Sequence, residues 1–545
     1  MILTKEQEKI INSDKLSFKI NAVAGSGKTT TLLEYAKKNS HLKILYLAYN
    51  KSLQTQLQEK LKEYKLSHMS VSTIHSLAYN RIQAYQYNLC HDLKVQTIEK
   101  VICHFEQYNN QKQYYPTAEY IALIKDLINF YCNSSLINLD SKLLDSYKKQ
   151  SDLGAKILEL LSNGKKVLSH IKEILSAMKN KLIDATHDFY LKMFFLNKKI
   201  SSNLGYDLIL VDEAQDISDV MIGVVESQDC RRIYVGDSFQ QIYSFRFATN
   251  ALNKIDLPAY DLSKSFRFGD DFAKSLANDL NKLYELKSSY KLNITGIESP
   301  TLIGKNHIDL DKPFCVIART TFGLIQQLVH FIHDNKKIYF EGGYNSYSFM
   351  NQTVYSIFYL KQKKNDKITI DEIKDFDSIY DLEQFAKDTK NQDYLNVIKF
   401  INAYGDNIFE INKKIKAKLT EKKELANIIF TTTHKANGLE YEQVIMADDF
   451  ITKKELLNPK NKISYLKAIE ELNIYYVAAT RAKKAIKMAD LNLSYTYNEN
   501  DETITYSKSR FIEKWPLEDG VLIQPPKSLH FREQLRNNFR SKMRI

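Results

Sequence analysis

The stretch NAVAGSGKTT at residues 21–30 constrains the fold of this chain more than any other segment. It nearly matches G-x-x-x-x-G-K-[ST], a loop that wraps phosphate groups, with Ala22 in place of the first glycine. The residues before it, LSFKINAV, favour a strand, and TTLLEYAKK after it favours a helix. Because this loop requires a strand on one side and a helix on the other, the sequence predicts an α/β domain around it.

The loop residues suit the phosphates of a nucleotide. Gly25 and Gly27 let backbone N–H groups turn toward an anion, and the following helix adds the partial positive charge of its N-terminus. Lys28 can reach the β- and γ-phosphates, and Thr29 can hold Mg²⁺. The alternative is a glycine-containing turn with an incidental lysine. We expect the nucleotide to contact Ala24, Gly25, Ser26, Gly27, Lys28, Thr29 and Thr30.

A second segment, YDLILVDEAQDI, supplies the acids that such a phosphate site needs. Residues 208–211 are four aliphatics in a row, as in a fully buried parallel strand. Asp212 at its end can bind the shell of a Mg²⁺ ion, and Glu213 can polarise an attacking water. The alternative is a solvated acidic turn. We therefore predict ATP and Mg²⁺ as the cofactors.

The motifs that follow carry a family resemblance. The segments are RRIYVGDSFQQIYSFRFA, LSKSFRF, THKANGLEY and IYYVAATRAKKAI, in this order along the chain. From Leu3 to about Leu491 the chain resembles the UvrD-like DNA helicases of superfamily 1A. The wording ADDF at 447–450 resembles the F-box-associated branch of that family. Because the segment that resembles the adenine-reading motif starts at residue 3, we expect no F-box domain ahead of it.

The resemblance assigns further nucleotide contacts. Gln7, in LTKEQEKII, would read the adenine edge, and Phe266 would stack on adenine where the family usually has tyrosine. Gln240 would sense the γ-phosphate. Glu440 would bind ribose or order its loop. Arg267 and Arg481 would both reach the γ-phosphate, and the full catalytic set would be Lys28, Glu213, Gln240, Arg267 and Arg481.

The resemblance also implies a nucleic-acid track. Aromatic rings would stack on bases, and polar side chains would meet the backbone. His434 and Lys435 would face DNA or couple the two sites, and Tyr476 would pack beside the DNA-side loops. For Tyr243 and His75 the alternative is a structural role. The residues assigned to nucleic acid are Tyr49, Asn50, Lys51, Thr73, His75, Tyr243, Phe245, His434 and Lys435.

The two arginines matter because they come from the second half of the chain. Lys28, Asp212 and Glu213 come from the first half. An arginine finger contributes about 10³–10⁵ to the rate of phosphoryl transfer, so hydrolysis would require the two halves to close on one nucleotide. ATP would then favour the closed state, and its loss would favour opening. A protein that grips DNA differently in these two states is a motor.

The alternation of buried strands with helical segments predicts parallel sheets. The expected fold is α/β, with two RecA-like parallel-sheet P-loop domains, each interrupted by a largely helical insertion. The expected ranges are 1–79 and 204–249 for the first domain, 80–203 for its insertion, 250–340 and 425–525 for the second domain, 341–424 for the second insertion, and 526–545 for a basic tail.

The second insertion and the tail are candidate sites for protein partners. Residues 351–424 hold 14 Lys or Arg and 13 Asp or Glu, which favours regulation or partner binding over phosphate contact. In the tail, Arg532, Arg536, Arg540 and Arg544 recur every four residues beside a similar apolar series. This pattern predicts an amphipathic basic helix, and the alternative is a frayed, solvated end.

Composition limits the class of protein. The net charge of +12 favours a polyanionic partner. The five cysteines include no C-x-x-C pair, so we expect buried thiols rather than a zinc site or disulfides. No apolar run approaches the ~20 residues of a membrane helix, and no secretory signal starts the chain. We expect no membrane partner and an intracellular location, cytoplasmic and nucleoid-associated, or nuclear in a eukaryote.

Taken together, the resemblance implies an ATP hydrolase coupled to DNA unwinding. It would be a monomeric 3′–5′ helicase or translocase on single-stranded and forked DNA, acting in repair, recombination or replication. One alternative is a translocase that strips proteins from DNA without separating strands. Another is a nucleic-acid-binding subunit that ATP switches. RNA remains an alternative track, because phosphate contacts and stacking discriminate poorly between the two polymers.

Overall fold

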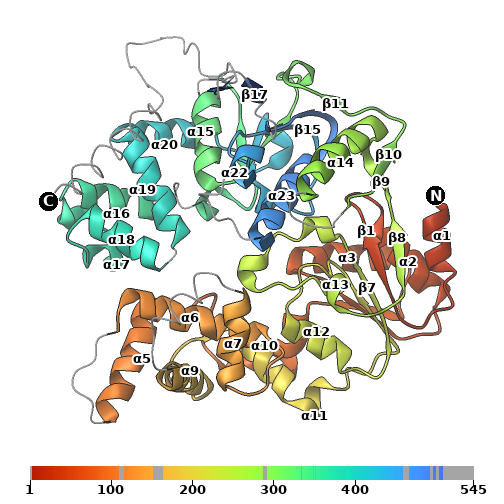
Figure 1. Ribbon diagram of the computed structural model, residues 1–545, viewed down its shortest axis with the longest axis horizontal. Coiled ribbons are helices and arrows are strands. Elements are labelled where there is room, and N and C mark those ends of the chain that lie inside the picture. Colours follow the sequence, from red (N-terminus) through yellow and green to blue (C-terminus); the bar gives the residue numbers. More distant parts are fainter. Residues whose placement is uncertain are drawn as a thin grey trace.

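The computed structural model describes residues 3–109, 116–150, 164–285, 291–332, 334–347, 349, 351–389, 391–457, 465–490, 495–498 and 503–506. Two α/β domains lie against each other, and each carries a helical body on the same side of the molecule (Figure 1). The basic tail at 526–545 lies outside the described residues, as does the part of the second domain expected beyond residue 506.

The first domain is built on a six-stranded parallel sheet. Its strand order is β3-β2-β6-β7-β1-β8, so the phosphate loop leaves a central strand. β2 and β6 are buried along their whole length, as expected for strands covered by helices on both faces. The strands are β1 (Phe18–Ala22), β2 (Ile44–Leu47), β3 (Met69–Ser72), β6 (Leu208–Val211), β7 (Arg231–Gly236) and β8 (Ala259–Leu262).

The last strand of this sheet corrects an expected boundary. β8 pairs in parallel with β1, yet it lies beyond residue 249, where we expected the first domain to end. The chain crosses the sheet once more after β7 before it enters the second domain, so the first domain reaches Leu262. The helices of this domain are α1 (Lys5–Ile11), α2 (Lys28–Lys38), α3 (Lys51–Glu63), α4 (Ile74–Arg81), α12 (Asp219–Glu226) and α13 (Ala251–Lys254).

The first insertion is helical. Its own apolar core joins α5, α6 and α9. Its helix α10 packs against α6 and also against α4 of the first domain. Two short strands, β4 (Leu89–Cys90) and β5 (Ala185–Thr186), close its base. The helices are α5 (Val95–Tyr108), α6 (Ala118–Asn133), α7 (Ser141–Gln150), α9 (Gly164–Lys179), α10 (His187–Leu196) and α11 (Lys198–Ser201).

The second domain repeats the plan of the first. Its parallel sheet has the order β11-β16-β15-β12-β14-β13, and a two-stranded parallel sheet of β9 and β10 links it to the first domain. The strands are β9 (Lys264–Gly269), β10 (Thr295–Ile297), β11 (Leu302–Ile303), β12 (Phe314–Ala318), β13 (Ile338–Phe340), β14 (Ile428–Thr432), β15 (Tyr441–Met446) and β16 (Ala482–Lys487). The helices are α14 (Asp270–Tyr284), α15 (Thr321–Phe331), α22 (Lys453–Leu457) and α23 (Tyr465–Ala479).

The second insertion is also helical, and one of its helices, α18, contacts α6 of the first insertion. The predicted fold class is therefore confirmed: two parallel-sheet domains, each with a largely helical insertion. The insertion helices are α16 (Gln352–Lys361), α17 (Asp371–Lys374), α18 (Ile379–Asp388), α19 (Gln392–Tyr404) and α20 (Asn407–Lys418). An antiparallel hairpin of β17 (Tyr495–Asn498) and β18 (Thr503–Tyr506) follows the second sheet.

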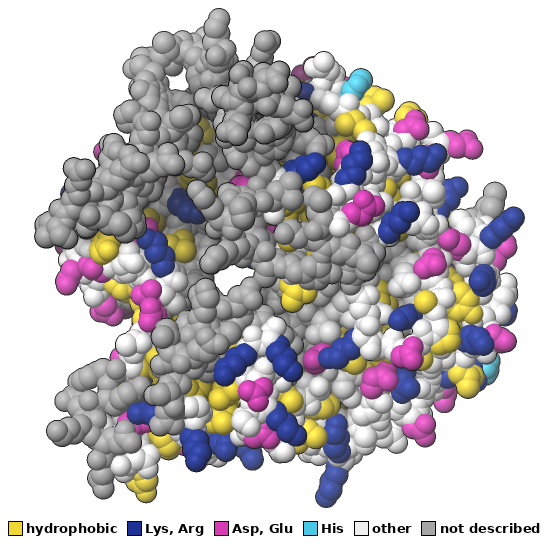
Figure 2. Space-filling view, in the orientation of Figure 1, with side chains coloured by type: hydrophobic (Ala, Val, Ile, Leu, Met, Phe, Trp, Pro, Cys, Tyr) yellow, Lys and Arg dark blue, Asp and Glu magenta, His cyan; other side chains and the backbone are white. Residues whose placement is uncertain are grey.

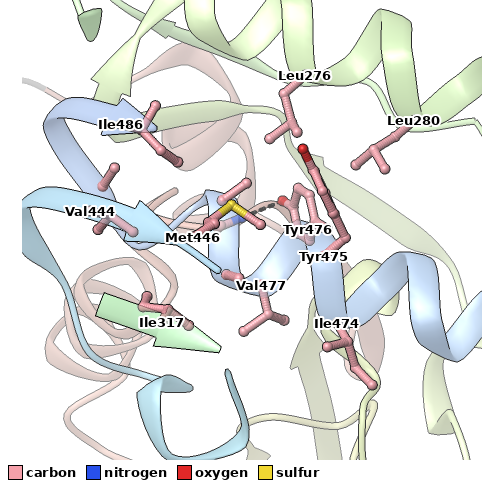
Figure 3. Packing of buried hydrophobic residues seen from close by; sticks show 14 of the residues in the cluster. Leu276, Leu280, Ile317, Val444, Met446, Ile474, Tyr475, Tyr476, Val477 and Ile486 are labelled. Atoms are coloured by element: carbon pink, nitrogen blue, oxygen red, sulfur yellow. Dashed lines mark hydrogen bonds between the residues drawn. The ribbon is translucent and has the colours of Figure 1, made fainter. Parts of the chain in front are cut away.

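The core of the second domain extends into the first. Val23 and Ala24 of the phosphate loop and Ile242 after β7 are buried in one cluster with residues of α14 and α23. Figure 3 shows the α23 part of this cluster, with Tyr475 pointing toward Leu276 and Leu280 of α14 and Tyr476 turned away from that helix toward its hydrogen bond with Ala24. Burial of apolar area at this boundary holds the two domains together around the loop.

The surface carries both signs of charge. On the face in Figure 2, the Lys and Arg side chains of the described residues are interspersed with Asp and Glu. Among the described residues, no helix is both long and apolar enough to cross a membrane.

Candidate nucleotide cleft and nucleic-acid interface

A cavity of about 440 Å³ lies between the two domains. Both halves of the chain line it, as expected if arginines from the second half reach a nucleotide bound by the first. The expected nucleotide residues that line it are Gly25, Ser26, Gly27, Lys28, Thr29, Thr30, Asp212, Glu213, Gln240, Arg267, Glu440 and Arg481. Three expected contacts, Gln7, Ala24 and Phe266, do not line this cavity.

The loop adopts the backbone that its glycines permit. Gly25 and Gly27 have φ angles of 73° and 77°, a region that residues with side chains rarely adopt. A Cβ atom on Gly25 would also lie 2.8 Å from the Cβ atom of Arg267, so a side chain there would push on the second domain. Ala22 ends β1 and is buried in the core of the first sheet, which accommodates its methyl group in place of a glycine.

Lys28 and Glu213 form the central ion pair of the cleft. The Lys28 Nζ donates to the Glu213 Oε2 at 2.8 Å, and Gln215 Nε2 donates to the same oxygen at 2.7 Å. Burial alone would lower the pKa of Lys28, but the charges of Glu213 and Asp212 outweigh it and raise that pKa. Glu213 has a φ of 50°, an uncommon backbone for a residue with a side chain, and it is held there by these contacts.

Asp212 lies beside this pair and is fixed by a residue that the sequence analysis missed. Tyr46, in β2, donates its hydroxyl to the Asp212 Oδ2 at 2.6 Å, and the Glu213 N–H donates to the Oδ1 at 2.9 Å. Burial and the neighbouring charge of Glu213 raise the pKa of Asp212 to about 6. A tyrosine in a strand that is otherwise apolar and buried is the signal that would have suggested this contact.

The donors here fit a hard cation that is shared with a nucleotide. Among the described residues, no group of three or more His, Cys, Asp or Glu side chains could hold a metal ion. The hydroxyl of Thr29 and the carboxylate of Asp212 are oxygen ligands of the kind that Mg²⁺ prefers, and phosphate oxygens and waters complete such a site. The residues therefore fit Mg²⁺ that arrives with a nucleotide.

Two arginines from the second domain meet this cleft. Arg267 donates from Nε to the Glu440 Oε2 at 3.1 Å and from Nη1 to the carbonyl of Thr480 at 2.9 Å. Arg481 is 1% exposed and donates to the carbonyls of Val477 and Leu439 at 2.8 and 3.1 Å. Burial and the charge of Arg267 lower the pKa of Arg481 to about 9.

The side chains of Tyr476 and Asp237 connect the phosphate loop to Gln240 through hydrogen bonds. Gln240 Nε2 donates to the Asp237 Oδ2 at 2.7 Å, and the Tyr476 hydroxyl donates to the same oxygen at 3.1 Å. The Tyr476 oxygen also accepts from the Ala24 N–H at 3.0 Å. We expected Tyr476 beside the DNA-side loops, and that expectation was wrong. α23 runs beneath the phosphate loop, where a buried hydroxyl finds the partners it needs.

The expected adenine contacts differ in how open they are. Phe266 is 43% exposed and lies next to Gly27, and its N–H donates to the Gly25 carbonyl at 2.8 Å. Gln7 is 3% exposed, and its Oε1 accepts from the Thr4 N–H at 3.0 Å. Its Nε2 donates to the Thr31 hydroxyl at 3.1 Å, so the protein already uses both ends of this amide.

Three expected nucleic-acid residues join the domains, and two of them, Tyr49 and Tyr243, line the same cavity as the phosphate loop. The Tyr49 and Tyr243 rings are 5.7 Å apart, and the Tyr243 hydroxyl donates to the His434 carbonyl at 3.0 Å. The His434 Nε2 lies 3.2 Å from the Ile242 carbonyl. Burial and the charge of Arg319 lower the pKa of His434 to about 4, so its imidazole is neutral at physiological pH.

Four of the remaining track residues already have protein partners. Asn50 caps α3 and Thr73 caps α4, each accepting a backbone N–H. The His75 Nε2 lies 3.3 Å from the Asp188 Oδ1 of the first insertion. Lys435 donates to the hydroxyl of Ser346 at 2.6 Å. Lys51 is exposed at the start of α3, and the side chain of Phe245 lies outside the described part of the chain.

The wording ADDF also has a local role. Asp449 accepts from the N–H groups of Arg319 and Thr320 at 2.9 and 2.7 Å, so it holds the segment that leads into α15, whose N-cap is Thr320. Arg319 in turn pairs with Glu471 of α23 at 2.7 Å. Sequence reasoning assigned no role to Arg319, Asp449 or Glu471.

Comparison with known proteins gives two kinds of match. Residues 3–254 match the family model of the UvrD/REP helicase N-terminal domain. The chain is 28% identical over 524 residues to F-box DNA helicase 1 of Gallus gallus, a match that covers 89% of this chain and 49% of that protein. It is also 28% identical over 525 residues to F-box DNA helicase protein 1 of Schizosaccharomyces pombe, covering 90% and 57%. The chain thus spans about half the length of these curated relatives.

Proposed function

We propose that the chain is a UvrD-like helicase of superfamily 1 and works as an ATP-driven motor on DNA, as its similarity to that family's N-terminal domain and to two F-box DNA helicases supports. One observation supports the proposal most strongly. The phosphate loop with its acids, from the first domain, and two arginines, from the second, line one cavity. A nucleotide there would contact both domains, so its chemistry and their relative motion would be linked.

The residues of the cleft suit the hydrolysis of ATP. Lys28 pairs with Glu213 at 2.8 Å, and incoming phosphates would compete for that ammonium. Glu213 would then be free to accept a proton from the attacking water. Thr29 and Asp212 would hold Mg²⁺, which would neutralise phosphate charge when bound. Gln240 would orient the water and sense the γ-phosphate.

The second domain would complete the site. The Arg481 guanidinium is buried. The acceptors of its hydrogen bonds are two carbonyls and the Thr480 hydroxyl, all of them neutral. A phosphate is the kind of anion that a planar guanidinium binds with two donors. Arg267 would join it after exchanging Glu440 for phosphate, because that pair is partly open to water. Both contacts form only when the domains are closed.

We propose that the track is DNA and that the motor moves 3′ to 5′ on single strands. The relatives' names specify DNA, and the polarity rests on the family resemblance. Tyr49, Tyr243 and Lys51 are the nearest candidates for base and backbone contact. Protein partners through the second insertion or the tail, monomeric action, work in repair, recombination or replication, and a place in the nucleoid or nucleus belong to the same proposal.

The first test is an ATPase assay with and without single-stranded DNA or RNA. We expect DNA to stimulate the wild type, and Lys28→Ala to abolish the stimulated rate because the β- and γ-phosphates lose their ammonium. Lys37→Ala is the matched control, since Lys37 is exposed on the same helix. Equal rates with and without either polymer would overturn the motor proposal, and stimulation by RNA alone would replace the track.

A second test asks whether the motor separates strands. Forked duplexes with one 3′ or one 5′ tail would report both unwinding and polarity. A translocase that only strips proteins is the second candidate, because the second insertion is short: its described α-helices lie between residues 352 and 418. It would hydrolyse ATP on single strands and displace a bound protein, yet leave every forked duplex intact.

A further inference from the structure

Helix α23 presents three polar side chains to the first domain. Glu470, Asn473 and Tyr476 are spaced by three residues and so lie on one face of the helix. Glu470 Oε1 accepts from the Ser244 N–H at 3.0 Å at one end. Tyr476 contacts Asp237 at the other end, near the phosphate loop. Asn473 lies between them, at the centre of the domain boundary.

Asn473 is buried and its amide is fully engaged. It is 2% exposed, and its Nδ2 donates to the carbonyl of Gln241 at 3.0 Å and, more weakly, to that of Ser238 at 3.4 Å. Its Oδ1 accepts from the Tyr284 hydroxyl at 2.7 Å. The two carbonyls flank Gln240 in the first domain, whereas Tyr284 is the last residue of α14 in the second.

These partners lead to three groups directed at the γ-phosphate. Ser238 and Gln241 bracket Gln240. α14 begins at Asp270, three residues after Arg267. α23 ends at Ala479, two residues before Arg481. One amide therefore contacts the segment that carries Gln240, lies on the helix that precedes Arg481, and holds the far end of the helix that follows Arg267. Asn473 itself does not line the cavity.

The amide also depends on domain contact. Both of its donor bonds cross the boundary, and a buried N–H that loses its acceptor costs about 1–3 kcal/mol. Its acceptor bond stays within the second domain. Asn473 is thus fully satisfied only when the segment around Gln240 and α23 are docked as they are here.

We propose that Asn473 is a positioning residue that sets Gln240 in register with Arg267 and Arg481. It lets the three groups reach the γ-phosphate together when the cleft closes. This inference rests on the proposed ATPase function and adds to it a residue that touches neither nucleotide nor track. Catalysis by positioned charges is sensitive to misplacement by about 1 Å, so the loss of this amide acts on the rate of hydrolysis.

The first test is Asn473→Ala, with kcat and KM for ATP measured under saturating single-stranded DNA. We expect kcat to fall about tenfold or more, while KM changes by less than about threefold, because the misplaced groups act in the transition state. The matched control is Asn281→Ala. Asn281 makes two similar bonds with Leu292 inside the second domain, so its loss lowers Tm without lowering kcat.

The second test uses Asn473→Asp and a pH profile. A carboxylate would face two carbonyl oxygens, whereas a protonated carboxyl can donate to one of them. We therefore expect the kcat of this variant, relative to wild type, to rise as pH falls from 8 to 6. A role in stability alone would give no such trend. In a double-mutant cycle, Tyr284→Phe should add little to Asn473→Ala, because the two residues share one hydrogen bond.

The outcomes separate this inference from the proposed function. If the wild type shows no ATPase activity that Lys28→Ala removes, the proposed function fails. If that activity is present but Asn473→Ala keeps the kcat of Asn281→Ala, the inference fails alone. A flat relative pH profile for Asn473→Asp would likewise overturn it.

Discussion

The residues expected at the nucleotide and those expected at the track use their polar side chains differently. On the nucleotide side, Lys28, Asp212 and Arg481 face one cavity, and their charges are only partly compensated by the protein. Among the residues expected at the track, Asn50 and Thr73 cap helices, and Lys435 is bound to Ser346, although Asn50 also lines this cavity. The protein thus keeps charge available at the cleft, while it already uses most of the polar groups expected at the track.

The difference follows from the ligands. Phosphoryl transfer needs a cation, a metal ligand and a base at fixed places, so the residue types are specified by the chemistry. A single strand can be gripped by ring faces, backbone groups and any nearby cation. Residues with local structural roles can share that work. The predictions below test whether this contrast is real, starting from the largest expected effect.

Arg481→Ala should reduce kcat for ATP by about 10³ if, as we propose, this arginine stabilises charge in the transition state. Steady-state ATPase at saturating ATP and single-stranded DNA measures the loss. Arg481→Lys is the matched variant: it keeps the charge but not the planar fork, and we expect it to recover only part of the rate. A loss below tenfold in Arg481→Ala would mean that this guanidinium stays on the carbonyls of Val477 and Leu439.

Tyr243→Ala should weaken binding to single-stranded DNA by about tenfold or more, because stacking on a base contributes about 1–3 kcal/mol. Fluorescence anisotropy with a labelled oligonucleotide measures the affinity. Tyr243→Phe keeps the ring and removes the hydroxyl that donates to the His434 carbonyl, so it should bind nearly as the wild type does. Equal losses in the two variants would show that Tyr243 acts through its hydrogen bond between the domains and not by stacking on a base. Tyr243 would then be one more track candidate with a structural role.

Tyr46→Phe should raise the Mg²⁺ concentration for half-maximal ATPase several-fold. The Tyr46 hydroxyl stabilises the Asp212 carboxylate, so its loss raises a pKa that is already about 6. A carboxyl with a higher pKa is protonated over a wider range, and the Mg²⁺ requirement should therefore diverge further from wild type as pH falls from 8 to 6. Mg²⁺ titrations of the ATPase rate at several pH values measure this.

Tyr234→Phe is the control for this prediction. The Tyr234 hydroxyl donates to Glu226 at the same 2.6 Å, in the same sheet but away from the cavity. Its loss should leave the Mg²⁺ requirement unchanged. An equal shift in the Mg²⁺ requirement of the two variants would show that the Tyr46 hydroxyl has no specific role at the Mg²⁺ site.

We expect the smallest effects for two lysines assigned to the track, Lys51 and Lys435, which should differ in how they change DNA affinity and its salt dependence. Lys51→Ala should weaken DNA binding a few-fold and lower the slope of log affinity against log salt by about 1, because an exposed ammonium can neutralise one phosphate. Lys435→Ala should leave that slope unchanged, since Lys435 donates to Ser346 and its Nζ lies 3.6 Å from the centre of the Tyr347 ring. Affinity measurements over a range of salt concentrations give both slopes.

The pH dependence provides a control for Lys435. Burial lowers the pKa of Lys435 to about 8, so the wild type loses this charge as pH rises from 7 to 9. If Lys435 bound phosphate, affinity would fall over that range in the wild type and not in Lys435→Arg. We expect the two proteins to show the same pH dependence.

The sequence predicted the nucleotide side better than the track side. GSGKTT and LILVDEAQD specify a strand, a loop and acids by residue type and spacing, and they meet at one cavity. The family model at 3–254 and the two relatives agree with the resemblance that these motifs suggested. The roles of individual residues stay predictions until the experiments above are done.

Three features were beyond sequence reasoning. Tyr46 and Asp212 are far apart in the chain and meet only because β2 and β6 are neighbours in the sheet. β8 lies beyond the expected end of the first domain, yet it pairs with β1 at the edge of the first sheet. The path of the chain across the sheet decides this pairing. Tyr476 lies beneath the phosphate loop because α23 packs against it.

The sequence by itself determined which chemical groups are present and on which local elements they sit, because glycine torsions, strand burial and helix caps depend on neighbours in the chain. The tertiary structure decided which of these groups meet. Parallel pairing brings Asp212 beside Lys28, and the docking of α23 against the segment around Gln240 brings the second domain to the first. Those contacts join residues that are hundreds of positions apart, and packing selects them once the sheets have formed.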